Sequence, residues 1–409
     1  MLQKYSLENG LKVVEEQMDG VRSISIGVWI LTGSRNESEY INGVSHLIEH
    51  MLFKGTKNRS AKDIAEAFDR IGGQVNAFTS KEYTCLYARV MDQHAEEALE
   101  VLSDMILNSV FDEEELEREK KVVLEEILMT EDTPDDIIHD YLHEVSFKNH
   151  PLSQTILGTR EVLHNLTREQ ILKYMNHYYT AKRMVVSIAG NVPQDFDRKV
   201  SVYFGGLKTS TDYDDQLTFS FSPGTTVKTD DISQSHLCLG YNGYPIGSDS
   251  VYSVSILNSV LGGSMSSRMF QQVREDKGLS YSIFSYHNPF RDNGILTIYS
   301  ATAPDQLEEM EGIINTIIDD VKENGITDEE LTNTIQQLKG QLVLGLENPS
   351  SRMNRNGRNE LLNQTHLSLN ELMNNLDTVS HEQIINSAKE LFNSQPARAL
   401  ISPKKHIVV

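Results

Sequence analysis

The feature that most constrains the fold is a repeat within the chain. The segment "FDEEELEREKKVVLEEI" from Phe111 resembles "ITDEELTNTIQQLKGQL" from Ile326, at a spacing of 215 (326 − 111). Both begin with an apolar residue and an acidic run, and both continue as a long helix. Self-similarity at one spacing is typical of a duplicated unit. The chain is therefore predicted to contain two similar domains.

Two further pairs of segments support this duplication. "LTREQILKYMNHYY" from Leu166 resembles "VSHEQIINSAKELF" from Val379, at a spacing of 213 (379 − 166). The helix-like stretch at His46 pairs with "LGGSMSSRMFQQVRE" from Leu261, again at 215 (261 − 46). The alternative is chance similarity between amphipathic helices. Three pairs in one order at a nearly constant spacing favour duplication instead.

Length and composition agree with two globular domains. A chain of 409 residues exceeds the size at which one hydrophobic core stops growing, and 39% hydrophobic residues suffice for packed cores. Helical segments alternate with strand-like runs, which predicts the α+β class in layered domains. The stretch "GGLKTSTDYDDQLTFSFSPGTTVKTDD" has linker composition. We predict an N-terminal domain at 1–210, a linker at 211–231 and a C-terminal domain at 232–409.

Composition also excludes several functions. The net charge of −22, without a basic stripe, argues against nucleic acid as a partner. No run approaches the roughly 20 apolar residues of a membrane span, and the N-terminus reads as two strands around an Asn9-Gly10 turn, so a cytoplasmic location is expected. Cys85 and Cys238 lack metal-site spacing, which predicts free thiols and excludes a cysteine-type zinc site.

The stretch "HLIEHMLFKGT" from His46 to Thr56 indicates a metal site. Residues four apart are neighbours on one face of a helix, so His46 and His50 point toward the same place, and Glu49 leans toward it. This is the H-x-x-E-H motif, in which two imidazoles suit zinc and a nearby carboxylate acts as base. The alternative is a helix face exposed to solvent, with no metal bound. A catalytic zinc also needs a third protein ligand.

The helix that follows Asp112, its expected N-cap, offers two candidate ligands. Glu119 and Glu126 are two turns apart and are predicted to share an inward face with Val122 and Val123, whereas Glu125 points to solvent. Burying an ionised carboxylate without a partner is costly, and a metal or metal-bound histidine would supply that partner.

The repeat lacks all of these candidate ligands. At a spacing of 215, Thr334 and Gln341 replace Glu119 and Glu126, while Leu261 and Met265 replace the two histidines. Residues with only a structural role would not be expected to disappear together.

A second histidine pair, His139 and His143, has the same i, i+4 spacing and is a rival candidate. No acid lies between the two histidines at a matching spacing, so we interpret them as residues that pack a helix or line a cleft.

These motifs resemble the M16 metallopeptidase family, which includes pitrilysin, insulin-degrading enzyme and the mitochondrial processing peptidase. In the family pattern, H-x-x-E-H is followed at a characteristic distance by a glutamate. Here "HLIEHMLFKGT" is followed by "EREKKVVLEEI", at the family's spacing of 76 from the second histidine to the glutamate (126 − 50). The resemblance implies one zinc ion per chain held by His46, His50 and Glu126. It also implies that Glu49 acts as catalytic base and that Glu119 supports the site.

Two more segments carry the resemblance and imply substrate contacts. "GGQVNAFTSKEYTCLYARV" resembles the family's substrate-binding edge strand, with Asn76 and Ala77 at its start. "RMFQQVREDKGLSYSI" resembles the second-half motif in which Arg274 and Tyr281 face the substrate. The alternatives are an ordinary strand start, a salt-bridged arginine and a core tyrosine.

The resemblance extends over essentially the whole chain and implies its architecture and activity. Each of the two homologous domains should be an antiparallel-rich sheet of four to six strands with helices on one face. The length matches short bacterial members, which implies a homodimer whose Arg274 and Tyr281 serve their own or the other subunit's zinc. The implied function is an endopeptidase for peptides and small unfolded proteins within an enclosed chamber. The alternatives are a non-catalytic subunit that binds peptides or presequences, and a metal-dependent binding or storage protein.

Overall fold

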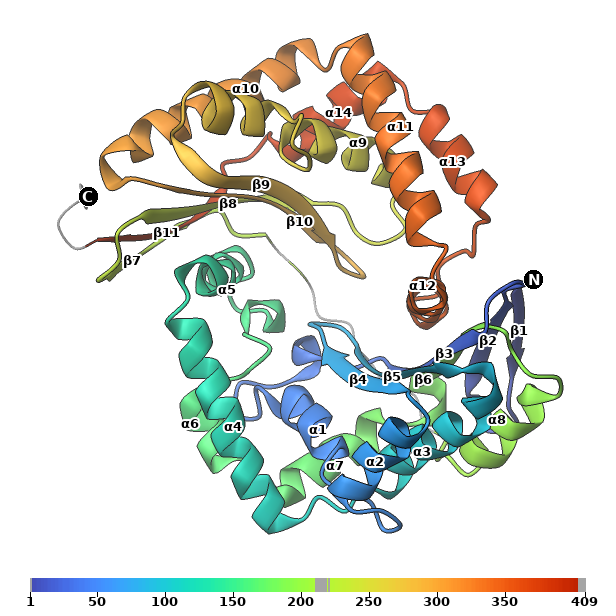
Figure 1. Cartoon of the computed structure of the whole chain (residues 1–409). Helices are drawn as coiled ribbons and strands as arrows, with labels where there is room; N and C mark the ends of the chain where they lie inside the picture. The colour runs from blue at the N-terminus through green and yellow to red at the C-terminus, as the bar shows by residue number, and fades with distance from the viewer. Residues whose placement is uncertain (1, 210–218, 220, 404–409) are drawn as a thin grey trace. The chain divides into compact units, whose positions relative to one another are not determined.

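The computed structural model describes residues 2–209, 219 and 221–403, which form two compact units (Figure 1). Unit 1 combines Met1–Leu128, Gln154–Gln216 and Leu344–His366, and unit 2 combines Met129–Ser153, Leu217–Val343 and Leu367–Val409. The predicted division at 1–210 and 232–409 follows the sequence repeat and stays a prediction. Residues 211–218 and 220 of the predicted linker lie outside the described residues.

The sheet of unit 1 has six strands in the order β1-β2-β6-β3-β5-β4. All neighbours are antiparallel except β2 and β6. The predicted turn at Asn9-Gly10 is confirmed, because Gly10 has a φ of +90° between β1 and its antiparallel neighbour β2. The strands are β1 Leu2–Ser6, β2 Lys12–Gln17, β3 Ser23–Ile30, β4 Gln74–Thr79, β5 Thr84–Met91 and β6 Met184–Gly190.

The sheet of unit 2 repeats this topology with five strands in the order β7-β11-β8-β10-β9. The parallel pair recurs as β7 with β11, and the other pairs are antiparallel. The strands are β7 Thr225–Asp230, β8 Ser235–Gly243, β9 Ser280–Pro289, β10 Gly294–Thr302 and β11 Ala397–Pro403. The matching order confirms the predicted duplication and the antiparallel-rich α+β fold.

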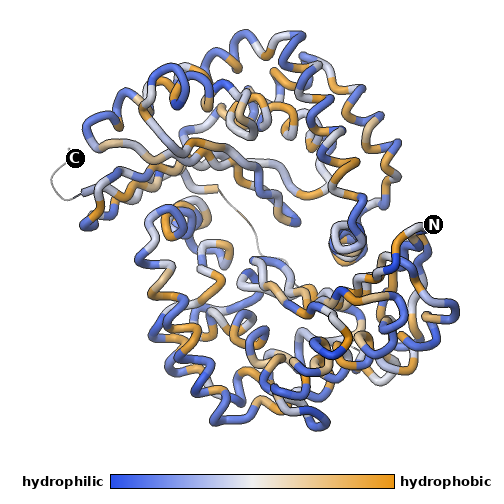
Figure 2. The backbone as a smooth tube through the Cα atoms, viewed as in Figure 1, coloured by the Kyte–Doolittle hydropathy of each residue, from blue (hydrophilic) through white to orange (hydrophobic). Residues whose placement is uncertain are grey.

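Helices cover one face of each sheet (Figure 1). In unit 1, Ile24, Ile26 and Val28 of β3 face this layer and are fully buried. Figure 2 shows hydrophobic segments in the sheets and mainly hydrophilic outer helix turns. The helices of unit 1 are α1 Val44–Leu52, α2 Ala61–Arg70, α3 Ala95–Asn108, α4 Glu113–Glu131, α6 Arg160–Asn165, α7 Arg168–Tyr178 and α8 Phe196–Phe204, of which α4 ends beyond the unit boundary. Those of unit 2 are α9 Val251–Leu261, α10 Leu307–Asn324, α11 Asp328–Gly345, α13 Leu369–Asp377 and α14 His381–Leu391, of which α11 also ends beyond the boundary.

The second face of each sheet carries one helix from the other half of the sequence. Helix α12 (Pro349–Leu361) packs on β3, β6 and β2 of unit 1, and α5 (Pro134–Ser146) packs on β11, β8 and β7 of unit 2. Glycines allow this close approach: a Cβ on Gly27 of β3 would lie 2.2 Å from Met353 Sδ, and one on Gly240 of β8 would lie 3.1 Å from Leu142 Cδ1. The starts of α5 and α12 show the repeat spacing of 215 (349 − 134), so the two helices are equivalent. Each half of the sequence therefore supplies this helix to the sheet of the other half.

The spacing of the repeat is confirmed for two of the three segment pairs. The starts of α4 and α11 are separated by 215 (328 − 113), and those of α7 and α14 by 213 (381 − 168). The third pair is wrong, because α9, the helix after β8, starts at a spacing of only 207 from α1 (251 − 44). The connection before α9 comprises residues 244–250, whereas the connection before α1 comprises residues 31–43 and is longer. Leu261 and Met265 are therefore not the counterparts of His46 and His50, although α9 contains neither histidine nor acid.

Candidate metal centre

Helix α1 presents both motif histidines on one side. It begins after Gly43, whose φ is +94°, and a Cβ there would lie 2.6 Å from the carbonyl oxygen of Leu157. Its remaining face enters the core of unit 1 through four residues that are at most 1% exposed, namely Leu47, Ile48, Met51 and Leu52. Since these residues anchor the helix, the imidazoles of His46 and His50 lie beside each other, with ring centroids 4.7 Å apart.

Helix α4 brings the two predicted carboxylates to α1. The N-cap prediction is confirmed, since Asp112 Oδ1 accepts hydrogen bonds from the backbone N–H groups of Glu114 (2.9 Å) and Glu115 (3.1 Å). Val123 and Glu119 are buried as predicted, but Val122 is 44% exposed. Consecutive helix residues are about 100° apart, so Val122 and Val123 do not share one face.

The three proposed ligand side chains converge in unit 1. His46 Nε2 is 3.6 Å from Glu126 Oε2, and His50 Nε2 is 3.7 Å from Glu126 Oε1. One ligand atom from each residue lies within 4.8 Å of the others. These distances are too long for hydrogen bonds but close to the roughly 3.4 Å between two ligand atoms that each lie about 2.1 Å from one tetrahedral zinc ion. Two imidazoles and one carboxylate are a donor set of catalytic zinc sites, so these residues fit zinc.

Glu119 lies behind His50, at the ring nitrogen that faces away from Glu126. Its Oε2 is 3.1 Å from His50 Nδ1, and its Oε1 is 2.7 Å from Lys54 Nζ. The glutamate side chain is only 7% exposed, so the lysine supplies the opposite charge that its burial requires. When Nδ1–H donates to Glu119, the lone pair of Nε2 is directed toward Glu126. A carboxylate behind a histidine is the usual support of a metal-binding imidazole.

The surroundings of the motif change two pKa values. Burial, with a smaller contribution from His50, lowers the pKa of His46 to about 4. This imidazole is therefore neutral at pH 7 and can donate its lone pair. Burial raises the pKa of Glu49 above its ordinary value, against the opposing effect of a hydrogen bond from Thr79. A carboxyl group with a raised pKa is better matched to proton transfer near neutral pH.

The predicted substrate residues of the first half lie on an edge strand. Strand β4 is the last strand of the six-stranded sheet and is paired with β5. Asn76 is exposed, and its Oδ1 accepts a hydrogen bond of 2.8 Å from the backbone N–H of Ala77. An extended peptide can add to such an edge by backbone hydrogen bonding.

The structure brings the two predicted substrate residues of unit 2 together. The guanidinium of Arg274 lies 4.6 Å from the ring centroid of Tyr281 and 4.5 Å from that of Phe270. Arg274 Nε also lies 3.4 Å from Glu275 Oε1. Tyr281 is 80% exposed, so its interpretation as a core tyrosine is wrong. The Tyr281 ring is therefore open to solvent, and the Arg274 side chain beside it is 33% exposed.

Two residues at the site were missed by the sequence analysis. The hydroxyl of Thr79 donates a hydrogen bond of 2.5 Å to Glu49 Oε2, and the buried carboxylate of Glu37 accepts from the backbone at the start of α1. Strand alternation could have shown that Thr79 shares a face with Ala77, but not which helix that face meets. Glu37 lies too far before α1 for the usual capping pattern.

The rival histidine pair makes packing contacts in unit 2. His139 Nδ1 is 2.9 Å from the hydroxyl of Tyr286, and the ring of His143 lies 5.2 Å from that of Phe147. Cys85 and Cys238 are free, as predicted, and both are buried.

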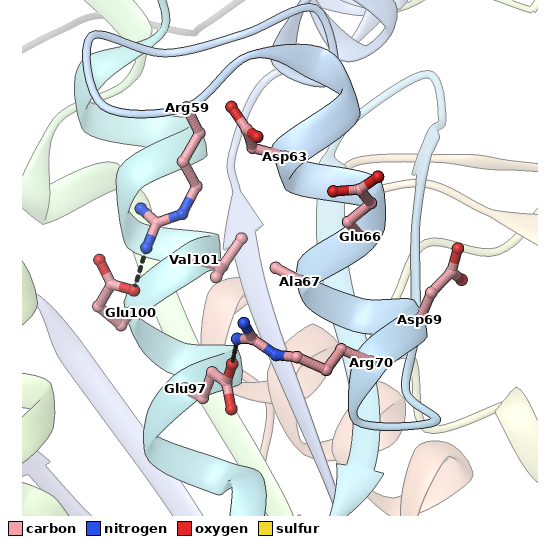
Figure 3. Close-up of a pocket in the computed structure, with 9 residues that line it drawn as sticks. All are labelled: Arg59, Asp63, Glu66, Ala67, Asp69, Arg70, Glu97, Glu100 and Val101. Carbon is pink, nitrogen blue, oxygen red and sulfur yellow. Dashed lines mark hydrogen bonds and ion pairs between the residues drawn. The ribbon is translucent and has the colours of Figure 1, made fainter.

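One pocket of unit 1, of about 760 Å³, lies away from the metal centre between α2 and α3 (Figure 3). Its two arginines pair with acids, Arg59 with Glu100 and Arg70 with Glu97. Its lining residues include none of the motif residues: Arg59, Asp63, Glu66, Ala67, Asp69, Arg70, Glu97, Glu100 and Val101. The candidate site is therefore the metal centre and not this pocket.

The fold and the site together define a class of protein. Two duplicated α+β units, with an H-x-x-E-H helix and a glutamate on a second helix, are typical of the metalloproteases with the inverted zinc motif. Among the described residues, no helix is long and apolar enough to cross a membrane.

Sequence comparison identifies the family. The family model "Insulinase (Peptidase family M16)" matches residues 12–160, and "Peptidase M16 inactive domain" matches residues 165–338. A Bacillus subtilis (strain 168) protein named "Uncharacterized zinc protease YmxG" is 49% identical over 403 residues, or 98% of each chain. A Rickettsia felis "Uncharacterized zinc protease" is 37% identical over 401 residues, which cover 97% of this chain and 96% of its own. The chain belongs to peptidase family M16 and is of the short bacterial type.

Solved structures share the fold over nearly the whole chain. A protease from Helicobacter pylori has a TM-score of 0.92 at 22% identity, and the match covers 98% of this chain and 99% of that one. A Pseudomonas fluorescens structure described as a peptidase M16 inactive domain has a TM-score of 0.92 at 20% identity, with 98% of each chain covered. Both support the fold.

Proposed function

We propose that the chain is a zinc-dependent endopeptidase that hydrolyses peptides and small unfolded proteins, with one zinc ion per chain. The observation that carries the proposal is the convergence of His46, His50 and Glu126 within 4.8 Å, on the helix pair that also holds Glu49. Relatives named zinc proteases support it.

Each residue at the centre has a distinct role in this proposal. His46, His50 and Glu126 hold the ion, and Glu119 fixes the ring of His50. When bound, zinc supplies Lewis-acid activation of a water molecule and of the peptide carbonyl. Glu49 accepts a proton from the attacking water and passes it to the leaving amine.

The substrate is proposed to bind as an extended strand. Its backbone adds to the free edge of β4 beside Asn76 and Ala77. Arg274 and Tyr281 bind carbonyl groups of the peptide, either in the same chain or across a homodimer that encloses a chamber. Gel filtration at the monomer mass with full activity would contradict the homodimer. Rapid digestion of a stable folded protein would contradict the chamber.

The decisive comparison is the wild-type protein with Glu49→Gln. We expect the variant to keep its zinc, because residue 49 is not a ligand, while turnover of a fluorogenic peptide library falls by about 10²- to 10⁴-fold, the usual contribution of a general base. A non-catalytic peptide-binding subunit or a metal-storage protein predicts no chelator-sensitive turnover in either form. Equal turnover in both forms would refute the proposed role of Glu49.

A further inference from the structure

We infer that Thr79 is a positioning residue for Glu49, and that the loop at 33–37 fixes the two residues relative to each other. This inference rests on the proposed function, since it concerns how the general base is held. It adds a role for one residue on the edge strand and for one loop before α1.

The hydroxyl of Thr79 is held in place by its strand. Thr79 is the last residue of β4 and pairs with Thr84 on β5. The Oγ1 atom of Thr79 lies 2.5 Å from Glu49 Oε2. A β-branched side chain in a strand has few rotamers, so the hydroxyl stays in this position. This bond occupies one carboxylate oxygen and limits rotation of the group. The other oxygen, Oε1, is the one left to exchange a proton.

The turn after Thr79 is fixed by the loop at 33–37. The backbone N–H of Arg35 donates to the carbonyl of Lys81 at 2.7 Å, and a Cβ on Gly33 would lie 2.2 Å from the carbonyl oxygen of Ser80. The side chain of Arg35 bonds Glu82 Oε1 at 2.7 Å, and both side chains are only 3% exposed. A buried, hydrogen-bonded ion pair of this kind ties the loop to one position of the turn.

The same loop also fixes the start of α1. Glu37 is 2% exposed, and its carboxylate accepts hydrogen bonds from the backbone N–H groups of Gly43 (2.7 Å) and Ser45 (2.8 Å). Helix α1 has no side-chain cap from Gly43 and no acid in its first turn. Glu37 therefore supplies the acceptor and the negative charge that a helix N-terminus favours. One loop thus connects the strand that carries Thr79 with the helix that carries Glu49.

Substitutions at Thr79 test the inference directly. Thr79→Val keeps the branched shape and removes the hydroxyl, and we expect kcat to fall roughly 10- to 100-fold, the worth of a hydrogen bond to a charged group. KM and zinc content should stay at the wild-type values. Thr79→Ser retains the hydroxyl and should restore most of the rate. The control is Ser187→Ala on β6 of the same sheet, which removes a buried hydroxyl that donates to the carbonyl of Met353 at 2.7 Å and should leave kcat unchanged.

A second measurement does not depend on activity. The ¹³C NMR signal of the Glu49 carboxyl, assigned with Glu49→Gln, is recorded in the metal-free protein. It should move or broaden in Thr79→Val and stay in place in Thr79→Ser and Ser187→Ala. A wild-type rate together with an unchanged signal in Thr79→Val overturns the inference. If wild-type protein loaded with zinc shows no turnover, the proposed function is refuted instead. The NMR signal then still tests the contact between Thr79 and Glu49.

The role of the loop is tested by Glu37→Gln with its own control. Asp104→Asn on α3 also neutralises a buried carboxylate, one that accepts four hydrogen bonds, from Thr56, Asn58, Arg59 and Asn108. Both variants should lose stability, but only Glu37→Gln should lower kcat and move the Glu49 signal. If neither variant moves that signal, the loop does not position Glu49.

Discussion

Replacing Gly357 with alanine should destabilise unit 1, although alanine normally stabilises a helix. Gly357 lies within α12 against Trp29, and a Cβ there would be 2.3 Å from Trp29 Nε1 and 2.5 Å from Cδ1. Carbon and nitrogen atoms that are not bonded prefer roughly 3.5 Å or more. Trp29 is 2% exposed and packs against Phe78 and Tyr83, so the indole can move only by displacing neighbouring side chains.

The expected magnitude is the difference of two opposing effects. Alanine in place of glycine favours a helix by about 1 kcal/mol. Overpacking a core costs about 1–3 kcal/mol, and overlap with a rigid ring belongs at the upper end of that range. The free energy of unfolding should therefore fall by about 2 kcal/mol. The control, Gly312→Ala on α10, has no atom within 4 Å of its Cβ and should gain about 1 kcal/mol instead.

Urea unfolding followed by fluorescence and by circular dichroism measures both changes. Trp29 is the only tryptophan in the chain, so its emission reports on the contact with α12. Circular dichroism follows the helices of both units and gives the shift for the control. An unfolding midpoint of Gly357→Ala at or above the wild-type value would refute the reasoning. So would equal shifts for the two variants.

Three further predictions concern the site and unit 2. Glu119→Gln should weaken zinc binding by about 10- to 100-fold, because Glu119 is proposed to orient the ligand His50. Competition with a chromogenic chelator tests this, and a wild-type affinity would contradict it. Tyr281→Ala should change unfolding by less than about 0.5 kcal/mol, since the ring is 80% exposed, while KM for peptides rises; an unchanged KM counts against the substrate role. Burial lowers the pKa of His287 from 6.5 to about 4, so the unfolded state is protonated first and stability should fall between pH 6.5 and 4. Thermal melts of His287→Gln should show a weaker loss over that range, and an identical loss would exclude this histidine as the cause.

The duplication and the site helices could be predicted from the sequence because local patterns encode them. Capping by Asp112 and the burial of Val123 follow from helix geometry, and the structure has both. The i, i+4 spacing of His46 and His50 likewise fixes their shared direction. The choice of Glu126 as a partner needed the family resemblance, since no local rule links residues so far apart in the sequence.

The remaining features depend on tertiary contacts that local patterns do not contain. The constant spacing of the repeat failed at α9 because the preceding loop has a different length, which helix periodicity does not report. The exchange of α5 and α12 was not predicted, because an amphipathic pattern shows that a helix is covered but not by which sheet. Thr79 was missed for the same reason, since its hydroxyl meets a side chain on a helix much earlier in the chain.

The exchange of α5 and α12 has a consequence for how the polypeptide is made. When the chain as far as Val343 has left the ribosome, the sheet surface that carries Ser25, Gly27 and Trp29 still lacks Pro349–Leu361, which covers it in the finished molecule. Conversely, α5 emerges long before the strands on which it packs. Neither half is therefore expected to reach its native state when expressed alone. Native structure should form only when the two halves, produced separately, are mixed.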